Sequence, residues 1–254
     1  MGRNGYARHD GMGMISGNTL AIPQPLEEAE PMGAGIDDDA MIDLYSFQHW
    51  DTIRRAFGRR GAYTPSLAKS REEAQREDAD AGVETPSWNV YGPAYRWMMK
   101  EMTEAGLRRP YAGASPFWAW ARWLDPDMQG SDDPSCLYEG FEDMYRGFQL
   151  LHLRVKASRV LCTSFDQYHC VLNNMPCGPI ALLADHDGDS LDQWLEDHWE
   201  DSDEQKRRQW HDNVIVPADR MPDDWVQACL WTITPADVLD ITEVVDDMLT
   251  ITTL

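Results

Sequence analysis

The sequence contains no apolar run of the roughly 18 residues that a membrane-spanning helix needs, and no apolar segment follows a basic start. None of its five cysteines forms a Cys-x-x-Cys pair, so their spacing indicates neither a disulfide framework nor a structural zinc site. P-loop, His-Glu-x-x-His and Gly-x-Ser-x-Gly motifs are also absent. These absences predict a cytoplasmic protein without a membrane segment, and they identify no metal site and no cofactor.

Basic residues are scarce in this chain. It has 44 acidic against 22 basic residues and only four lysines, which gives a formal net charge of -22. Sequence-independent affinity for DNA comes mainly from Lys and Arg side chains that neutralise phosphates, so this charge argues against direct binding in a nucleic-acid groove. Two interpretations of the acids stay open: a solvated surface that follows overall composition, and a mimic of DNA.

The length and the composition support one folded domain. A chain of 254 residues with 43% hydrophobic residues and eleven Trp is long enough for one sizeable core. Residues 1–40 have no hydrophobic periodicity, so ordering them would cost conformational entropy that little burial offsets, and we expect a disordered tail there. For residues 41–254 we expect a single α+β domain with a small mixed or antiparallel sheet flanked by helices.

Strand and helix patterns interleave over residues 41–254 without a repeat. Alternating apolar and polar residues predict strands over Met41–Trp50, Phe117–Trp123, Leu151–Val155 and Val226–Ile233. Helical spacing predicts helices over Thr52–Phe57, Tyr95–Met102 and, as one long polar helix, Asp189–Asn213. The segment Lys69–Glu84 is charged and lacks an apolar face, so no core element is expected there.

The stretch Ser-Phe-Asp-Gln-Tyr-His-Cys-Val-Leu-Asn-Asn-Met-Pro, residues 164–176, predicts a capped helix. Ser164 followed three residues later by Gln167 is the capping-box pattern, in which each side chain bonds the amide of the other residue. Apolar residues at helical spacing supply one face, and the final proline prevents continuation. We expect a helix over Ser164–Asn173 with Phe165 and Leu172 buried.

This helix does not explain His169. The residue falls on or beside the apolar face, where a buried imidazole needs a partner, and Asp166 lies within reach one turn earlier. An Asp-His pair is either a general base or a satisfied structural contact, so Asp166 and His169 are candidate catalytic residues with a structural alternative. Cys170 comes directly after the histidine, and because adjacent helix residues do not face each other, no Cys-His dyad is expected between them.

Five segments occur in an order that resembles a known family: Leu-Tyr-Ser-Phe-Gln, Tyr-Arg-Trp-Met-Met, Ser-Pro-Phe-Trp-Ala-Trp-Ala-Arg-Trp, Leu-Cys-Thr-Ser-Phe-Asp-Gln-Tyr-His-Cys-Val-Leu-Asn-Asn and Val-Gln-Ala-Cys-Leu-Trp-Thr-Ile-Thr. Over Leu44–Val245 the chain resembles the bacterial and phage family named domain of unknown function 3841. Its most specific part is Phe-Asp-x-x-His-x-Val-Leu-Asn. Members typically open with Leu-Trp-Thr-x-Gln, whereas this chain has Tyr45 and Ser46. The resemblance implies a phage or mobile-element setting and supplies no reaction.

Two groups of metal-capable side chains have spacings that do not fit a metal site. Asp185–Glu196 places acids at positions 1, 3, 5 and 12 of a calcium loop, but its glycine stands at position 4 instead of 6. The second group lacks the paired short spacing of structural zinc. It consists of His152, Cys162, His169, Cys170 and Cys177.

The motif-bearing residues are expected to converge at one sheet edge, because each lies in a strand or at the start of a helix. Asp166 and His169 are joined there by four candidate ligand-binding residues, Tyr45, Gln48, Trp120 and Gln227. The leading hypothesis is a binding or interaction domain whose partner is an unidentified protein or a small nucleotide. The alternatives are a nucleotide- or NAD-handling transferase similar to ADP-ribosyltransferases, suggested by a first strand with Tyr45 and Ser46 before a short helix and a glycine, and a DNA mimic.

Overall fold

The computed structural model describes residues 40–123, 137, 145, 147–179, 189–218, 221, 225–245 and 248–251. They form one α+β domain in which helices flank a single antiparallel sheet, which confirms the predicted fold class. The tail predicted for residues 1–40 lies outside the described residues, apart from Ala40. Within the described part of the chain, no helix is both long and apolar enough to span a membrane.

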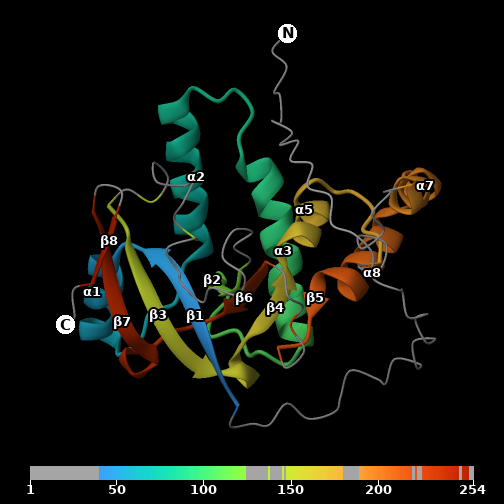
Figure 1. Cartoon of the computed structure of the whole chain (residues 1–254). Coiled ribbons are helices and arrows are strands. Elements are labelled where there is room, and N and C mark those ends of the chain that lie inside the picture. Colours follow the sequence, from blue (N-terminus) through green and yellow to red (C-terminus); the bar gives the residue numbers. More distant parts are fainter. Residues whose placement is uncertain are drawn as a thin grey trace, which may run out of the picture. The chain divides into compact units, whose positions relative to one another are not determined.

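The sheet of the described residues has eight strands in the order β5-β4-β6-β2-β1-β3-β7-β8, and each neighbouring pair is antiparallel (Figure 1). Strand β1 lies near the middle although it comes first in the chain, between β2 and β3. The strands are β1 (Met41–Gln48), β2 (Phe117–Arg122), β3 (Gln149–Lys156), β4 (Leu161–Ser164), β5 (Ile215–Val216), β6 (Val226–Leu230), β7 (Val238–Val245) and β8 (Met248–Ile251).

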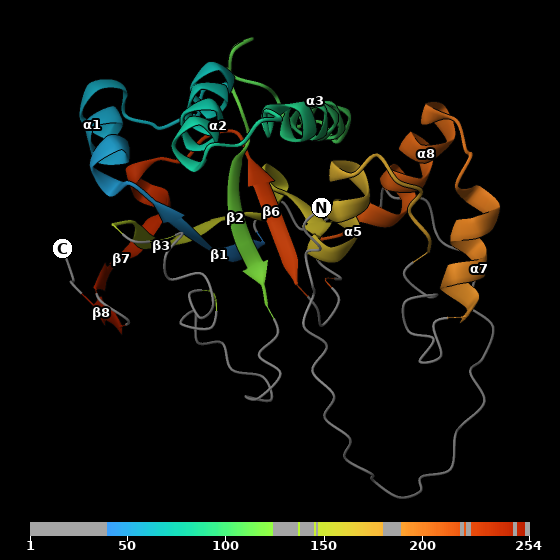
Figure 2. The same cartoon turned by 90° about the horizontal axis from the view of Figure 1, so that it is seen from above.

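Six α-helices are described, together with two short 3-10 helices. Figure 2 shows α1, α2 and α3 side by side along one margin of the domain, with α5, α7 and α8 at the end opposite β8. The helices are α1 (Trp50–Arg60), α2 (Leu67–Ala81), α3 (Trp88–Glu104), α5 (Phe165–Leu172), α7 (Asp189–His198), α8 (Asp203–Val214), η2 (Ala157–Arg159) and η3 (Pro235–Asp237).

Two helical regions differ from the sequence-based expectation. The charged segment in which no core element was expected forms most of α2, a 15-residue helix that buries only Ala74 and ends at Gly82 in the left-handed conformation. The long helix predicted over Asp189–Asn213 is two helices, because Ser202 forms a capping box with Gln205 that starts α8. The second difference comes from a helix cap, whereas the first reflects a helix that has almost no apolar stripe and no side-chain cap at its start.

Apolar residues at alternate strand positions pack into the first core. Leu44 on β1 and Leu151, Leu153 and Val155 on β3 are fully buried, as their alternation predicts. Ile53 of α1 packs against them. Each such side chain contributes about 1.5–3 kcal/mol through burial. This core includes residues from strands β1 to β6, so it joins sheet neighbours that are far apart in the chain.

A second core lies where α3, α5 and α8 cover the sheet. It is rich in large side chains, among them Trp97, Met98, Tyr168 and Trp210. The two core clusters use opposite sets of strand positions: Ala228 of β6 belongs to the first, and its neighbour Cys229 belongs to the second.

Candidate functional site

Three adjacent strands bring three of the predicted site residues into one row. Tyr45 on β1 is paired with Trp120 on β2, and Trp120 is paired with Gln227 on β6. Residues directly opposite each other on antiparallel strands point to the same side of the sheet. The row continues to Thr163 on β4 and, in the other direction, to His152 on β3.

Aromatic contacts connect this row to α5. The ring of Trp120 lies 5.0 Å from the ring of Phe165, which in turn lies 4.7 Å from the imidazole of His169. Tyr45 stacks on His152 with ring centroids 4.5 Å apart and planes 9° from parallel. Strand pairing joins Tyr45 to Trp120, and the ring of Phe165 then connects Trp120 to His169.

Gln48 does not belong to this row. It lies three residues after Tyr45 in the same strand, so its side chain points to the opposite side of the sheet. There its Nε2 donates to Ser46 Oγ at 2.9 Å, and that hydroxyl donates to the carbonyl of Trp118 at 2.7 Å. The expected convergence of Gln48 with the other candidates is therefore not found.

The helix predicted over Ser164–Asn173 forms, but its buried face differs from the prediction. Ser164 caps α5 by accepting a hydrogen bond from the amide of Gln167. The Gln167 side chain does not return to Ser164, because its Nε2 donates to the carbonyl of Gly178. Phe165 and Leu172, which were expected to be buried, are partly exposed, and the residues that face α3 and α8 are Tyr168 and Val171.

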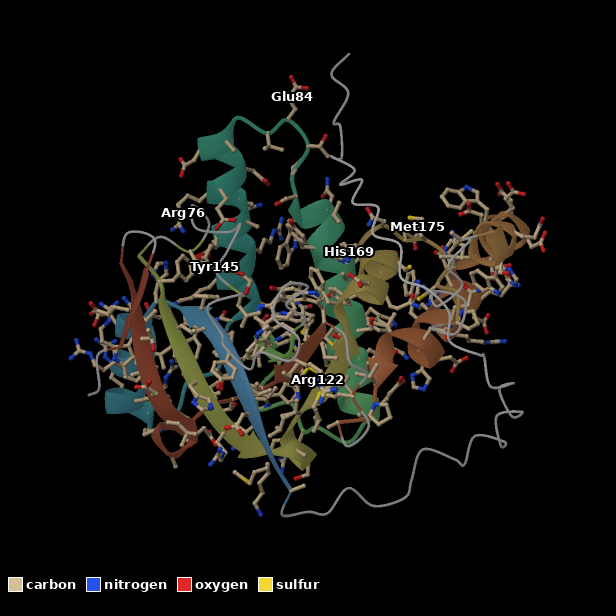
Figure 3. The ribbon with its side chains drawn as sticks, in the orientation of Figure 1. Arg76, Glu84, Arg122, Tyr145, His169 and Met175 are labelled. Atoms are coloured by element: carbon tan, nitrogen blue, oxygen red, sulfur yellow. The ribbon has the colours of Figure 1, made fainter. Side chains whose placement is uncertain are left out.

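The expectation of a buried His169 is wrong. Its imidazole is exposed, and Nδ1 lies 3.0 Å from the carbonyl oxygen of Phe165 one turn earlier. Asp166 is exposed as well. The side chains of α5 that turn away from the sheet reach solvent, so this helix face needs no buried polar partner. Figure 3 shows His169 on α5, apart from Arg76 of the cleft described next.

A cleft of about 980 Å³ lies between α1 and α2. Its floor includes Gln48 and the linker between the two helices, with Tyr63, Thr64 and Ser66. Two further aromatic residues, Tyr111 and Phe148, contribute to its rim, and the Phe148 ring stacks on His49 at 4.1 Å. The cleft therefore combines a wide opening with several ring faces.

Cations dominate the walls of this cleft. It contains five of the 22 basic residues of the chain and two carboxylates, Glu72 and Glu73. Arg76 lies 3.5 Å from Glu73, whereas Arg59, Arg60 and Lys69 have no ion pair within the described residues. The five basic residues are Arg55, Arg59 and Arg60 on α1 and Lys69 and Arg76 on α2.

The pKa of Tyr63 reflects the burial and the charges at the floor of the cleft. Burial raises the pKa of its phenol, Glu73 and Tyr111 raise it further, and the Arg60 guanidinium acts in the opposite direction. The phenol thus stays neutral at physiological pH and is available as a hydrogen-bond donor. A neutral donor beside unpaired cations suits an anionic ligand.

Long-range hydrogen bonds hold α1 and the linker that follows it in place. The amide of Trp50, the first residue of α1, donates to Oε1 of Gln149 on β3 at 3.0 Å. Tyr63 and Ile233 exchange two backbone hydrogen bonds of 2.8 and 2.9 Å. The α1 helix ends at Gly61, whose φ of 69° turns the chain toward that contact.

This cleft is not among the sites predicted from the sequence. Its clearest signal was Ile-Arg-Arg-Ala-Phe-Gly-Arg-Arg, residues 53–60, a cluster of four arginines in a strongly acidic chain. The other wall, α2, was not predicted as a helix. The sequence therefore did not indicate that two helices with basic residues lie on either side of a cleft. Of the predicted site residues, only Gln48 lines the cleft.

Metal-capable side chains do not gather in the described part of the chain, where no group of three His, Cys, Asp or Glu residues is placed to hold an ion. His152 instead contacts Asp43, with Nε2 2.9 Å from Oδ1, and Arg154 binds the same carboxylate through two nitrogens. Residues 185–188 of the calcium-like segment lie outside the described residues, and the rest of that segment belongs to α7.

Comparison with protein-family models, with curated proteins and with solved structures yields no match to this chain.

Proposed function

We propose that this protein is a binding domain for a small phosphorylated ligand of the nucleotide class, held in the cleft between α1 and α2. The observation that carries the proposal is the set of unpaired cations, Arg59, Arg60 and Lys69, in a chain whose net charge is -22. A cation without a partner gains the most from an incoming anion, because no existing ion pair has to be broken.

The choice of a phosphate group follows from the donors. Arginine presents a planar fork that matches the oxygens of a phosphate or a carboxylate, and three of the five cations are arginines of α1. The surrounding acidic surface repels long polyanions, whereas a small ligand needs only the local field of the cleft. The same field disfavours a nucleic-acid duplex as the ligand.

The choice of a nucleotide follows from the rings and the size. A base stacks on an aromatic face for about 1–3 kcal/mol. The rim offers such faces at Tyr111 and at the stacked pair of His49 and Phe148. The cleft volume of about 980 Å³ lies at the upper end of the range for small-molecule sites, so it accommodates a base, a sugar and two phosphates together.

A transferase similar to ADP-ribosyltransferases is the second candidate, and it uses the same cleft. The observation in its favour is Glu73, a carboxylate that shares the cleft with the unpaired cations and acts on the pKa of Tyr63. The test is release of nicotinamide from NAD by the purified protein. Loss of that release in Glu73→Gln, with NAD binding retained, would support the transferase.

Titration calorimetry at low and at high salt tests the binding proposal, with ADP, NAD, inorganic phosphate and uncharged adenosine as ligands. We expect ADP or NAD to bind, adenosine to bind far more weakly, and added salt to weaken the charged ligands. Arg59→Gln should weaken binding about tenfold or more, since a hydrogen bond to a charged group contributes about 1.5–3 kcal/mol.

Arg54→Gln is the matched control, because Arg54 lies on the same helix, outside the cleft, in an exposed ion pair with Asp51. It changes the net charge equally and should leave affinity nearly unchanged. The proposal fails if none of the phosphorylated ligands binds, or if both arginine variants weaken binding to the same extent.

A further inference from the structure

The thiols of Cys170, on α5, and Cys177 pack in the same core and act on each other's pKa. The sulfur of Cys177 donates to Oε1 of Gln167, 2.7 Å away, and the thiol of Cys170, its second possible acceptor, packs against the same core. A thiol carries a single proton, so Cys177 donates to one of these acceptors at a time. Neither residue is used by the cleft between α1 and α2.

A tight turn brings the two cysteines together. After α5 ends, Asn174 adopts a left-handed conformation with φ of 52°. The amide of Met175 then donates to the carbonyl of Cys170 at 2.8 Å, which folds the chain back along the helix. The two cysteines are seven positions apart in sequence, and the turn places the second beside the first.

The returning segment is fixed to α8. Trp210 Nε1 donates to the carbonyl of Met175 at 2.8 Å. The backbone of Cys177 is held on both sides, because its amide donates to Oε1 of Gln209 and its carbonyl accepts from Nδ2 of Asn213. Cys177 is therefore held in position, so two mobile side chains do not have to be brought together before they can react.

The two thiols differ in access and in acidity. Cys170 is partly exposed, and Cys177 is fully buried. The hydrogen bond from Cys177 lowers the pKa of the Cys170 thiol, against the effect of burial. The same contact and burial raise the pKa of Cys177. The accessible member is thus also the stronger acid, which is the arrangement of an attacking and a resolving thiol.

We propose that Cys170 and Cys177 are a site of reversible disulfide formation by exchange with a low-molecular-weight disulfide such as glutathione disulfide. The Cys170 thiolate attacks one sulfur of glutathione disulfide, forms a mixed disulfide and releases one glutathione thiolate. That thiolate takes the proton of Cys177, and the Cys177 sulfur then attacks Cys170 and releases the second glutathione. One glutathione disulfide and two protein thiols become one protein disulfide and two glutathione thiols.

The other described cysteines serve as internal controls. Cys162 and Cys229 are also free, but both are buried. Burial raises the pKa of Cys162 to about 12 and that of Cys229 well above its ordinary value. Neither forms a thiolate near neutral pH, so neither is expected to react in the folded protein.

Exchange is tested on the full chain with Cys136 replaced by Ser, since Cys136 lies outside the described residues. The reduced protein is incubated with glutathione disulfide, unreacted thiols are alkylated under denaturing conditions, and peptides are identified by mass spectrometry. We expect a Cys170–Cys177 disulfide, with Cys162 and Cys229 alkylated. In a separate alkylation of the folded protein, Cys170 should react more than about tenfold faster than Cys162, because one pKa unit changes the thiolate fraction roughly tenfold.

Two variants separate the roles. Cys177→Ser removes the resolving thiol, so Cys170 should accumulate as a mixed disulfide with glutathione. Cys170→Ser removes the attacking thiol, and Cys177 should then stay reduced. A mixed disulfide at Cys170 that persists in the parent protein would overturn the pairing, and reaction of Cys162 or Cys229 at the rate of Cys170 would overturn the assigned selectivity. Thermal melts of each variant verify that the fold is kept.

Discussion

Asp237 and Arg159 form a two-point ion pair that joins the two 3-10 helices. Nη1 and Nη2 of Arg159 lie 2.5 and 3.0 Å from the two carboxylate oxygens of Asp237. The amide and the hydroxyl of Thr234 also donate to this carboxylate, and Arg159 donates in addition to the carbonyl of Thr232. The pair therefore fastens the end of β3 to the turn that starts β7.

Asp237→Asn should lower the free energy of unfolding by about 1–3 kcal/mol at pH 7, because it leaves the Arg159 fork without its charged partner. Burial raises the pKa of Asp237, but the hydrogen bonds from Arg159 and Thr234 outweigh burial and hold the pKa below its ordinary value. A carboxyl with a lowered folded-state pKa stabilises above its unfolded pKa, and this contribution is lost as the pH falls through the folded-state pKa.

Denaturant unfolding of both proteins at pH 7 and at pH values near and below 4 measures this difference. The gap between parent and variant should shrink toward acid pH. Asp51→Asn serves as the control, because the Asp51 pair with Arg54 is exposed and should contribute little at any pH. A gap that stays constant with pH would contradict the assignment.

Two glycines at the end of α1 should respond in opposite directions to the same substitution. Gly61 has a φ of 69°, so Gly61→Ala should destabilise by about 1–2 kcal/mol through backbone strain. Gly58 lies inside the helix, and a Cβ added there would meet no neighbouring atom within 4 Å, so Gly58→Ala should stabilise by about 0.5–1 kcal/mol. Thermal denaturation measures the change in stability caused by each substitution. If both changes had the same sign, α1 would not end at Gly61.

The buried carboxylate of Glu101 on α3 depends on His211 of α8. The two side chains approach to 2.7 Å, and the carboxylate is only 4% exposed. Lys100 Nζ lies 3.6 Å from the other oxygen of this carboxylate. His211→Ala should cost about 1–3 kcal/mol, because the buried carboxylate loses the closer of its two partners. A double-mutant cycle with Glu101→Gln should give a coupling energy of about 0.5–3 kcal/mol, whereas additive losses would mean that the contact does not join α3 to α8.

His169→Ala should change the free energy of unfolding by less than about 0.5 kcal/mol, because the imidazole is exposed. Tyr168→Ala, one residue earlier, should cost several kcal/mol by leaving a cavity in the second core, about 3–5 kcal/mol for a large aromatic residue. Chemical denaturation compares the neighbours directly. If His169→Ala lowered the free energy of unfolding as much as Tyr168→Ala does, the face of α5 that carries His169 would have to be buried, in contradiction to this structure.

The four central strands of the sheet, β6, β2, β1 and β3, were predicted from the sequence, whereas β4, β5, β7 and β8 were not. Their buried residues, such as Leu44, Leu151 and Val155, stand at alternate positions. Such a period of two indicates a strand whose two faces have different surroundings. The Ser164 cap was also readable, since a hydroxyl before a helix has a local partner. Both patterns depend on residues close in sequence.

The cleft and the burial of α5 were not predictable in the same way. The α2 helix buries only Ala74, so it has almost no apolar stripe to reveal it. Phe165 looked like a core residue, but its exposure depends on where α3 and α8 pack, which is set by contacts far away in sequence. Single-sequence patterns report local periodicity and carry little information on such placements.

The two backbone hydrogen bonds between Tyr63 and Ile233 affect when the cleft can form during synthesis of the chain. These residues are 170 positions apart, and the hydroxyls of Thr64 and Thr232 meet beside them at 2.7 Å. A nascent chain that has emerged only through α3 holds every basic residue of the cleft but lacks the strand end that fixes the linker between its walls. The proposed anion site is therefore expected to be among the last features to assemble, and a ligand that recognised it would distinguish a finished molecule from a growing one.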